Sequence, residues 1–240
     1  MSSLLQTLGR NLDAVRQRAA EACRVVGRSP DSVQLIAVTK YAQMEWIEGL
    51  IALGHSQFGE NRPQQLAERQ ARWPQVEWHL IGHLQRNKAK SVLGTTALIH
   101  SVDSLRLAVR LSELTLAARQ ESTGWKPIPQ PILCEVNVSG EASKDGFPLA
   151  DLLASWDQLT ALPGLDLRGL MTMAPLSADP ESARPVFAKL RQLRDELRDR
   201  SSGAIPLSEL SMGMSGDFEI AIEEGATLIR VGSRLFEGLA

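Results

Sequence analysis

Short apolar runs alternate with helical patterns along nearly the whole sequence. Strands are expected at residues 33–39, 56–60, 76–81, 97–102, 131–138, 165–171, 207–211 and 227–231. Helices are expected between them, at roughly 43–53, 62–72, 86–93, 104–121, 149–161, 180–200 and 217–224, and a further short helix could follow Ser233. Strands that alternate with helices form parallel sheets through right-handed crossovers. Eight such units predict an α/β chain with a single closed (β/α)8 TIM-type barrel over residues 1–240.

An extra helix precedes the first strand. Apolar residues recur at steps of three and four from Leu4 to Val26, the period of an amphipathic helix, and Gly27 ends it. An open doubly wound sheet is the alternative to the barrel. Its nucleotide-binding fingerprint, G-x-G-x-x-G, does not follow the first strand, so we favour the barrel.

Composition narrows the function. The 240 residues are 43% hydrophobic and 22% charged, with a formal net charge of -2, which excludes disorder and argues against nucleic acid as a partner. No 18-residue apolar run is present, so we expect no membrane association. Cys23 and Cys134 lie far apart and suit a reducing compartment, which predicts a cytoplasmic protein.

Lys40 directly follows the first expected strand, at the end of a barrel where reactive groups lie. Partial desolvation there would lower the pKa of the lysine and favour the neutral amine that forms a Schiff base. A surface lysine with no chemical role is the alternative. Position alone does not decide between the two.

Two loops at the last two expected strands are rich in glycine and serine. They read Leu210-Ser-Met-Gly-Met-Ser-Gly-Asp217 and Ile229-Arg-Val-Gly-Ser233. Glycines let backbone N–H groups approach an anion, and hydroxyls add donors. Because barrels frequently hold phosphate between these two loops, the pair predicts a phosphate site.

Two polar residues at strand ends have alternative interpretations. Arg230 shares a strand face with Leu228 and Gly232, and this face could line the lumen. It could then face a ligand or form a salt bridge with a buried carboxylate. Asn61 could contact a ligand or cap the helix that begins near Pro63.

Other chemistries find little support. His79 and His83 have a metal-ligand spacing only for a helix, whereas a strand is expected there, so we expect no metal site and interpret His79 as a hydrogen-bonded barrel residue. His55 and His100 belong to no recognisable constellation. The hydrolase motif G-x-S-x-G is absent.

Several motifs together resemble the pyridoxal phosphate homeostasis protein family, also called the YggS or PROSC family. They are Ala37-Val-Thr-Lys40, Phe58-Gly-Glu-Asn-Arg62, Trp78-His-Leu-Ile-Gly82, Leu84-Gln-Arg-Asn-Lys88, Gly169-Leu-Met-Thr-Met173, Leu210-Ser-Met-Gly-Met-Ser215 and Ile229-Arg-Val-Gly-Ser233. The resemblance implies a barrel like the N-terminal domain of alanine racemase, that is, a fold type III protein that binds pyridoxal 5'-phosphate (PLP).

The resemblance also implies a set of cofactor-binding residues. Lys40 matches the lysine that binds PLP as a Schiff base, and Arg230 matches the arginine that faces the pyridine nitrogen. The other matched positions are Asn61 in the pocket and, near the phosphate, Ser211, Met212, Gly213, Gly232 and Ser233.

The function implied is that of a non-catalytic PLP carrier or regulator in vitamin B6 homeostasis and amino-acid and keto-acid balance. Alanine racemase adds a tyrosine from a second domain and a partner subunit, whereas we expect no second domain here, and the only tyrosine, Tyr41, is poorly placed to oppose Lys40. One alternative is a PLP-dependent amino-acid racemase or lyase that uses Lys40 as base. Another is a barrel that binds a different phosphorylated metabolite noncovalently.

Further expectations concern partners and family differences. PLP-dependent apoenzymes are the expected recipients of the cofactor, and the chain is expected to be a monomer. Lys144 resembles a family loop lysine that could act as a second amine. The sequence departs from many relatives at His83, where they have proline, and in its tail, Phe236-Glu-Gly-Leu-Ala240.

Overall fold

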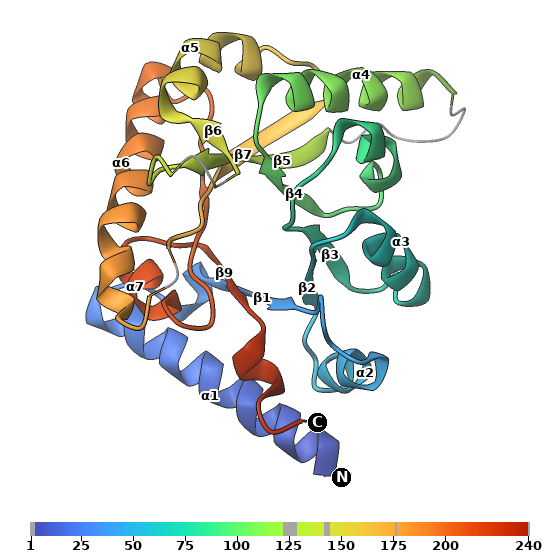
Figure 1. Ribbon diagram of the computed structural model, residues 1–240, viewed down its shortest axis with the longest axis vertical. Helices are drawn as coiled ribbons and strands as arrows, with labels where there is room; N and C mark the ends of the chain where they lie inside the picture. Colours follow the sequence, from blue (N-terminus) through green and yellow to red (C-terminus); the bar gives the residue numbers. More distant parts are fainter. Residues whose placement is uncertain (1–2, 122–128, 142–144, 176, 240) are drawn as a thin grey trace.

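Eight parallel strands close into a barrel in the computed structural model, which describes residues 3–121, 129–141, 145–175 and 177–239. The closure follows from the pairing of β9 with β1 at one seam and of β4 with β5 at the other (Figure 1). A two-residue strand, β6 (Phe147–Pro148), pairs with β5 outside this ring. In order around the barrel, the strands are β1 (Gln34–Val38), β2 (Gln57–Glu60), β3 (Glu77–Leu80), β4 (Leu98–Val102), β5 (Gln130–Asn137), β7 (Leu165–Met171), β8 (Glu209–Ser211) and β9 (Leu228–Val231).

The prediction of a (β/α)8 barrel is therefore confirmed, and each strand lies within two residues of its expected bounds. Helices surround the strands as the crossovers require (Figure 1). They are α1 (Ser3–Val25), α2 (Met44–Ala52), α3 (Pro63–Arg72), α4 (Leu105–Glu121), α5 (Leu149–Thr160), α6 (Arg184–Arg200) and α7 (Phe218–Glu223). In the described part of the chain, four 3-10 segments add to these, at Pro30–Ser32, Arg86–Val92, Pro180–Ala183 and Ser233–Phe236.

Three expected helical segments differ in type from the prediction, and the short one after Ser233 is a 3-10 helix. The segment expected at 86–93 is a 3-10 helix, and its only buried residues, Ala89 and Val92, are three apart, which matches three residues per turn. The segment expected at 180–200 begins as a 3-10 turn and becomes α6 at Arg184, with Pro185 in the first α-helical turn, where a missing N–H costs least.

The N-terminal helix α1 lies outside the ring and packs on α2, α7 and the last 3-10 segment. It buries Leu8, Leu12 and Val15, in agreement with the three-four spacing of the sequence. The Asn11 amide donates to the carbonyl oxygens of Leu235 at 3.2 Å and Glu237 at 2.8 Å. These bonds attach the helix to the end of the chain, and Figure 1 shows both termini at one end of the molecule.

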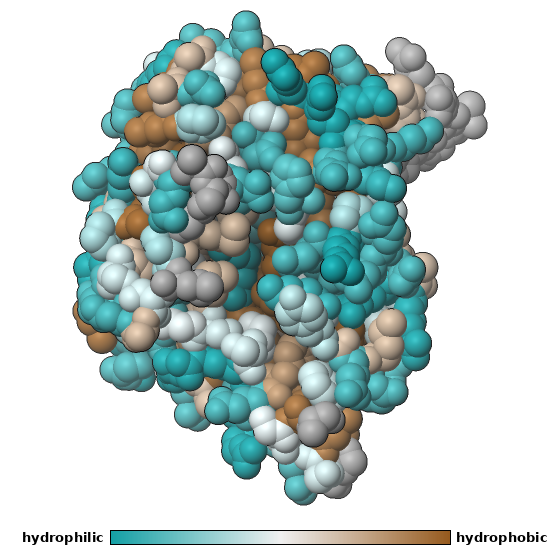
Figure 2. Space-filling view, in the orientation of Figure 1, coloured by the Kyte–Doolittle hydropathy of each residue, from teal (hydrophilic) through white to brown (hydrophobic). Residues whose placement is uncertain are grey.

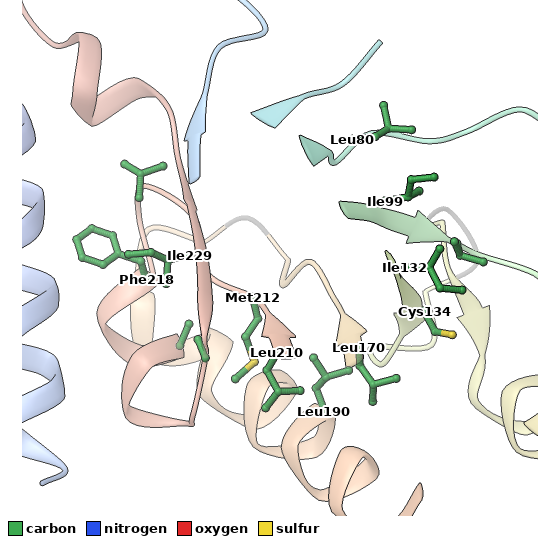
Figure 3. Packing of buried hydrophobic residues seen from close by; sticks show 14 of the residues in the cluster. Leu80, Ile99, Ile132, Cys134, Leu170, Leu190, Leu210, Met212, Phe218 and Ile229 are labelled. Carbon is green, nitrogen blue, oxygen red and sulfur yellow. The ribbon is translucent and has the colours of Figure 1, made fainter. Parts of the chain in front are cut away.

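The main core lies between the strands and the surrounding helices. In Figure 3, Leu170 and Leu210 project from neighbouring strands toward Leu190 of α6. Hydrophilic residues cover most of the face seen in Figure 2, and apolar residues show between them in separate patches. Both cysteines are free and buried. Within the described residues, no helix is long and apolar enough to cross a membrane.

The barrel lumen contains a second, smaller apolar cluster. It consists of Ile36, Leu98, Leu133, Met171 and Leu228, one from each of five strands. Neighbouring residues on the same strands, Ile132, Leu170 and Ile229, instead face the helices, as strand alternation requires. The lumen is therefore filled, and polar side chains share it with this cluster.

Candidate functional site

A cavity of about 630 Å³ opens at the carboxyl ends of the strands. Its walls come from the segments after β1, β2, β3, β7, β8 and β9. This is the end of the barrel where the sequence placed the reactive groups. Five of the eight predicted site residues line it, namely Lys40, Asn61, Arg230, Gly232 and Ser233.

Lys40 is an exposed side chain of the cavity wall, two residues after the end of β1. Its Nζ atom lies 5.2 Å from the ring centre of Tyr41, which is 85% exposed. Tyr41 thus lies beside Lys40 and does not oppose it across the cavity.

Asn61 is half-buried and lines the cavity directly after β2. The N-cap of α3 is Arg62, so the capping interpretation of Asn61 is wrong. Gly82 explains how the ends of β2 and β3 approach each other: a Cβ atom there would lie 2.4 Å from the Asn61 carbonyl oxygen. Close approach of this backbone therefore requires glycine.

A buried ion pair supports the segment that carries Lys40. Glu60, at the end of β2, is fully buried and pairs with Arg69 of α3. Thr39 donates its hydroxyl to the same carboxylate. The Glu60 carboxylate is thus engaged by Arg69 and Thr39 and does not line the cavity.

Arg230 projects from β9 into the lumen and is 4% exposed. Its Nη1 donates to Ser211 Oγ at 2.6 Å, and its Nη2 donates to the Thr172 carbonyl at 3.0 Å. Burial lowers the pKa of Arg230 to about 10, against the opposing influence of Glu135 and Asp217. No ion pair among the described residues includes Arg230, so the salt-bridge alternative has no support and the guanidinium remains available to a ligand.

The other three predicted residues do not line the cavity. Ser211 and Met212 are fully buried, and the Met212 N–H donates to the Leu228 carbonyl at 3.1 Å. Gly213 packs under α7, where a Cβ atom would lie 2.5 Å from the Ala221 side chain. The strand-like hydrogen bonding of β8 thus continues one residue beyond Ser211, and the exposed part of the loop begins later than the sequence predicted.

Met214, Ser215 and Gly216 line the cavity instead. They belong to the glycine-rich loop that the sequence identified, three residues further along it. Ser215 Oγ accepts a 3.1 Å hydrogen bond from the N–H of Gly232, which joins this loop to the one after β9. The two loops predicted to form a phosphate site are therefore adjacent.

Backbone donors are available at this junction. Within the part of the chain that the structure describes, the N–H groups of Ser215, Gly216 and Ser233 donate to no other group. Gly216 and Ser233 are exposed, and Ser215 is half-buried. Unpaired N–H groups beside serine hydroxyls are the donor set that an oxyanion requires.

Two further groups of polar residues are buried in the barrel outside the cavity lining. Burial raises the pKa of the Glu135 carboxyl to about 7, and Asp145 and Asp103 add to this shift. His100, expected to belong to no constellation, lies 3.0 Å from His79, measured between ring nitrogens. No group of three or more potential metal ligands occurs among the described residues, and Lys144 lies outside them.

Comparisons with known proteins agree with this architecture. The family model "Alanine racemase, N-terminal domain" matches residues 10–239. The pyridoxal phosphate homeostasis protein of Aquifex aeolicus is 40% identical over 227 residues, which cover 94% of this chain and 95% of that protein. The protein of the same name from Pseudomonas aeruginosa is 39% identical over 234 residues, with coverage of 97% and 96%.

A solved structure is also similar to this chain over nearly its whole length. PipY of Synechococcus elongatus PCC7942, solved with PLP bound, superposes with a TM-score of 0.80 at 36% identity. The match covers 95% of this chain and 99% of that one.

Proposed function

Since the chain belongs to the pyridoxal phosphate homeostasis protein family, we propose that it binds PLP through Lys40 and acts as a carrier or regulator of this cofactor. Its role would lie in vitamin B6 homeostasis and in amino-acid and keto-acid balance. One observation supports this most strongly: a single cavity brings together a lysine amine, a buried arginine and a loop junction with free donors.

The phosphate group would bind where the two glycine-rich loops meet. The N–H groups of Ser215, Gly216 and Ser233 have no other acceptor in the described structure, and both serine hydroxyls adjoin them. These neutral donors suit a phosphate dianion. In this proposal Ser211, Met212 and Gly213 support the site from below, and Gly232 joins its two halves.

Arg230 would face the pyridine nitrogen, and Asn61 would contact the cofactor from the β2 side. When bound, PLP supplies a reactive carbonyl carbon and a ring whose electron-withdrawing strength depends on protonation of its nitrogen. A guanidinium only donates hydrogen bonds, so Arg230 would favour the unprotonated ring and weaken it as an electron sink. This supports binding without catalysis.

The surroundings of Lys40 support the same conclusion. A racemase needs a second acid or base across the cofactor from the lysine. Tyr41 lies next to Lys40, and Glu60 is engaged with Arg69. We therefore propose a non-catalytic protein formed by one barrel domain over residues 1–240.

We further propose a cytoplasmic monomer that delivers PLP to PLP-dependent apoenzymes. Two free, buried cysteines agree with a reducing compartment. The barrel closes within one chain, so the cavity needs no second subunit for its walls.

The test is the visible absorption spectrum after incubation with PLP, followed by borohydride reduction and peptide mapping. We expect a new absorption band and a reduced adduct on Lys40, both lost in Lys40→Ala and retained in Lys88→Ala, which changes an exposed lysine elsewhere. A colourless protein without an adduct would contradict the proposal. Exchange of amino-acid α-hydrogen faster than with free PLP would instead indicate a racemase or lyase.

A further inference from the structure

A continuous row of polar side chains crosses the barrel interior from the cavity to the opposite end. Hydrogen bonds connect each member to the next, and β9, β8, β4, β3 and β2 contribute to it. In order from the cavity, the row consists of Arg230, Ser211, His100, His79, Gln57 and Glu77.

The half nearest the cavity is fully enclosed. Arg230 Nη1 lies 2.6 Å from Ser211 Oγ, and Ser211 Oγ lies 2.8 Å from His100 Nδ1. Ser211 and His100 are 0% exposed, so water cannot replace these partners. Each group must therefore satisfy its hydrogen bonds within the row.

The other half reaches the surface. His100 Nε2 lies 3.0 Å from His79 Nδ1, and His79 Nε2 lies 2.7 Å from Gln57 Oε1. Gln57 Nε2 then donates to Glu77 Oε2 at 2.8 Å, on the exposed end of the barrel.

The exposed end fixes the direction of the bonds. The Glu77 carboxylate only accepts, so Gln57 turns its amide nitrogen to Glu77 and its oxygen to His79. His79 must then carry its proton on Nε2. Burial lowers the pKa of His79 to about 4, so the ring is neutral and its Nδ1 accepts a proton donated by His100.

The proton positions nearer the cavity follow in the same way. Burial holds the pKa of His100 well below its ordinary value, so this ring is also neutral, with its proton on Nε2. Its Nδ1 therefore accepts from the Ser211 hydroxyl, which leaves the oxygen lone pairs of Ser211 for Arg230. In every hydrogen bond of the row, the donor is then the residue nearer the cavity and the acceptor is the residue further from it.

This common direction has an electrostatic effect. Each acceptor atom in the row faces the cavity, so the negative ends of the five aligned hydrogen bonds point toward the Arg230 guanidinium. This buried cation has no ion-pair partner in the described structure. In an interior of low polarity, such bonds strengthen one another. The row can thus stabilise the Arg230 guanidinium in one orientation.

We propose that His100 and His79 are positioning residues that hold Arg230 at the cavity through Ser211. Arg230 is held by this row on Nη1 and by the Thr172 carbonyl on Nη2. The statement about Arg230 stands on this structure alone. Its consequence for the bound cofactor rests on the proposed function.

The first test needs no cofactor. Long-range 1H–15N spectra of the 15N-labelled, PLP-free protein report the proton position on each histidine. We expect both rings to be neutral with the proton on Nε2 from pH 5.5 to 8. A proton on Nδ1 of either ring, or double protonation at pH 6, would overturn the directed row.

The second test measures Arg230 itself, whose guanidinium 15N signals are assigned with Arg230→Lys. His100→Leu should shift these signals, whereas His100→Asn, similar in size and able to accept from Ser211, should restore them partly. Gln57→Leu perturbs the row from the exposed end, so it tests the row even if the His100→Leu variant does not fold. Unchanged Arg230 signals in both His100→Leu and Gln57→Leu would overturn the positioning role, and His83→Asn, outside the row, is the control.

The third test is PLP affinity. We expect His100→Leu and Ser211→Ala to weaken binding by about tenfold, the effect of one hydrogen bond to a charged group, and Ser211→Thr to weaken it less. Loss of affinity without any change at Arg230 would contradict the proposal. If the wild type binds no PLP while the histidine and arginine signals behave as expected, the proposed function fails and the positioning role stands.

Discussion

The guanidinium of Arg69 donates a 2.7 Å hydrogen bond to the carbonyl oxygen of Thr39, the residue immediately before Lys40. Arg69 also forms the buried ion pair with Glu60, and it donates to the Ala42 carbonyl at 3.4 Å. One side chain of α3 thus holds the backbone on both sides of Lys40.

Arg69→Met should destabilise the protein strongly. It leaves the carboxylate of Glu60 buried without a cation, and the second oxygen of that carboxylate already lacks a partner. Breaking a buried pair in this way typically costs about 3–5 kcal/mol of unfolding free energy. Urea unfolding measures the loss.

Arg72→Met is the matched control. Arg72 is on the same helix and pairs with Glu48, but both side chains are about half exposed, so its loss should cost about 1 kcal/mol or less. Equal losses for the two variants would show that burial of the Arg69 pair contributes little.

The sequence predicted those features of the fold that depend on local pattern. The apolar, β-branched run before Lys40 predicted β1, and the alternation around Arg230 predicted that its side chain lies on the face opposite Ile229 and Val231. The carboxyl-end rule for barrels then located the cavity, because it depends only on strand direction.

Contacts that depend on strand register could not be predicted from the sequence. The register of β3 and β4 pairs His79 with Leu98, and His100 lies two residues further along β4, close enough for the two rings to contact each other. A register shift between Ile99 and Val102 of β4 adjoins this contact. No spacing along the chain encodes this pairing. Likewise, the sequence identified the loop after β8, but it did not predict that the part of the loop lining the cavity begins at Met214.

Gly213→Ala should destabilise the loop after β8. Gly213 has a φ of +91°, which side-chain-bearing residues rarely adopt, and its Cβ would lie 2.9 Å from the Phe218 Cα as well as against Ala221. Backbone strain and overpacking together predict a loss of about 2–4 kcal/mol. Thermal and urea unfolding measure it.

Gly9→Ala provides the comparison. Gly9 is in α1, and a Cβ atom there meets only Leu53 side-chain carbons, at 3.8 Å or more. Alanine should raise stability by up to about 1 kcal/mol at this helical position. If both substitutions were neutral, the tight packing of Gly213 would not constrain the loop.

Ser233→Asp should weaken PLP binding by tenfold or more. The carboxylate would stand at the loop junction proposed for the phosphate, where Gly232 and Ser215 are hydrogen-bonded. Two like charges in contact disfavour binding, and added salt should reduce the difference. Equilibrium titration monitored by absorbance measures the affinity.

Ser233→Asn separates charge from shape, because asparagine has nearly the same size as aspartate without its charge. We expect it to retain most of the affinity. Equal affinity of the aspartate and asparagine variants would place the phosphate elsewhere.

The last prediction concerns pH. Burial raises the pKa of Glu135 from 4.5 to about 7, with Asp145 and Asp103 adding to the shift and Arg230 opposing it. The folded state therefore favours the protonated carboxyl, so stability from this group is complete below pH 4.5 and is lost as pH rises through 7. A pKa shift of this size corresponds to about 3 kcal/mol of unfolding free energy. Glu135→Gln removes the ionisation. In urea unfolding, the free energy of unfolding of the variant relative to the wild type should therefore be higher at pH 8 than at pH 5. Glu113→Gln, at an exposed surface pair, should keep the wild-type dependence, and a Glu135→Gln variant that also kept it would contradict the elevated pKa.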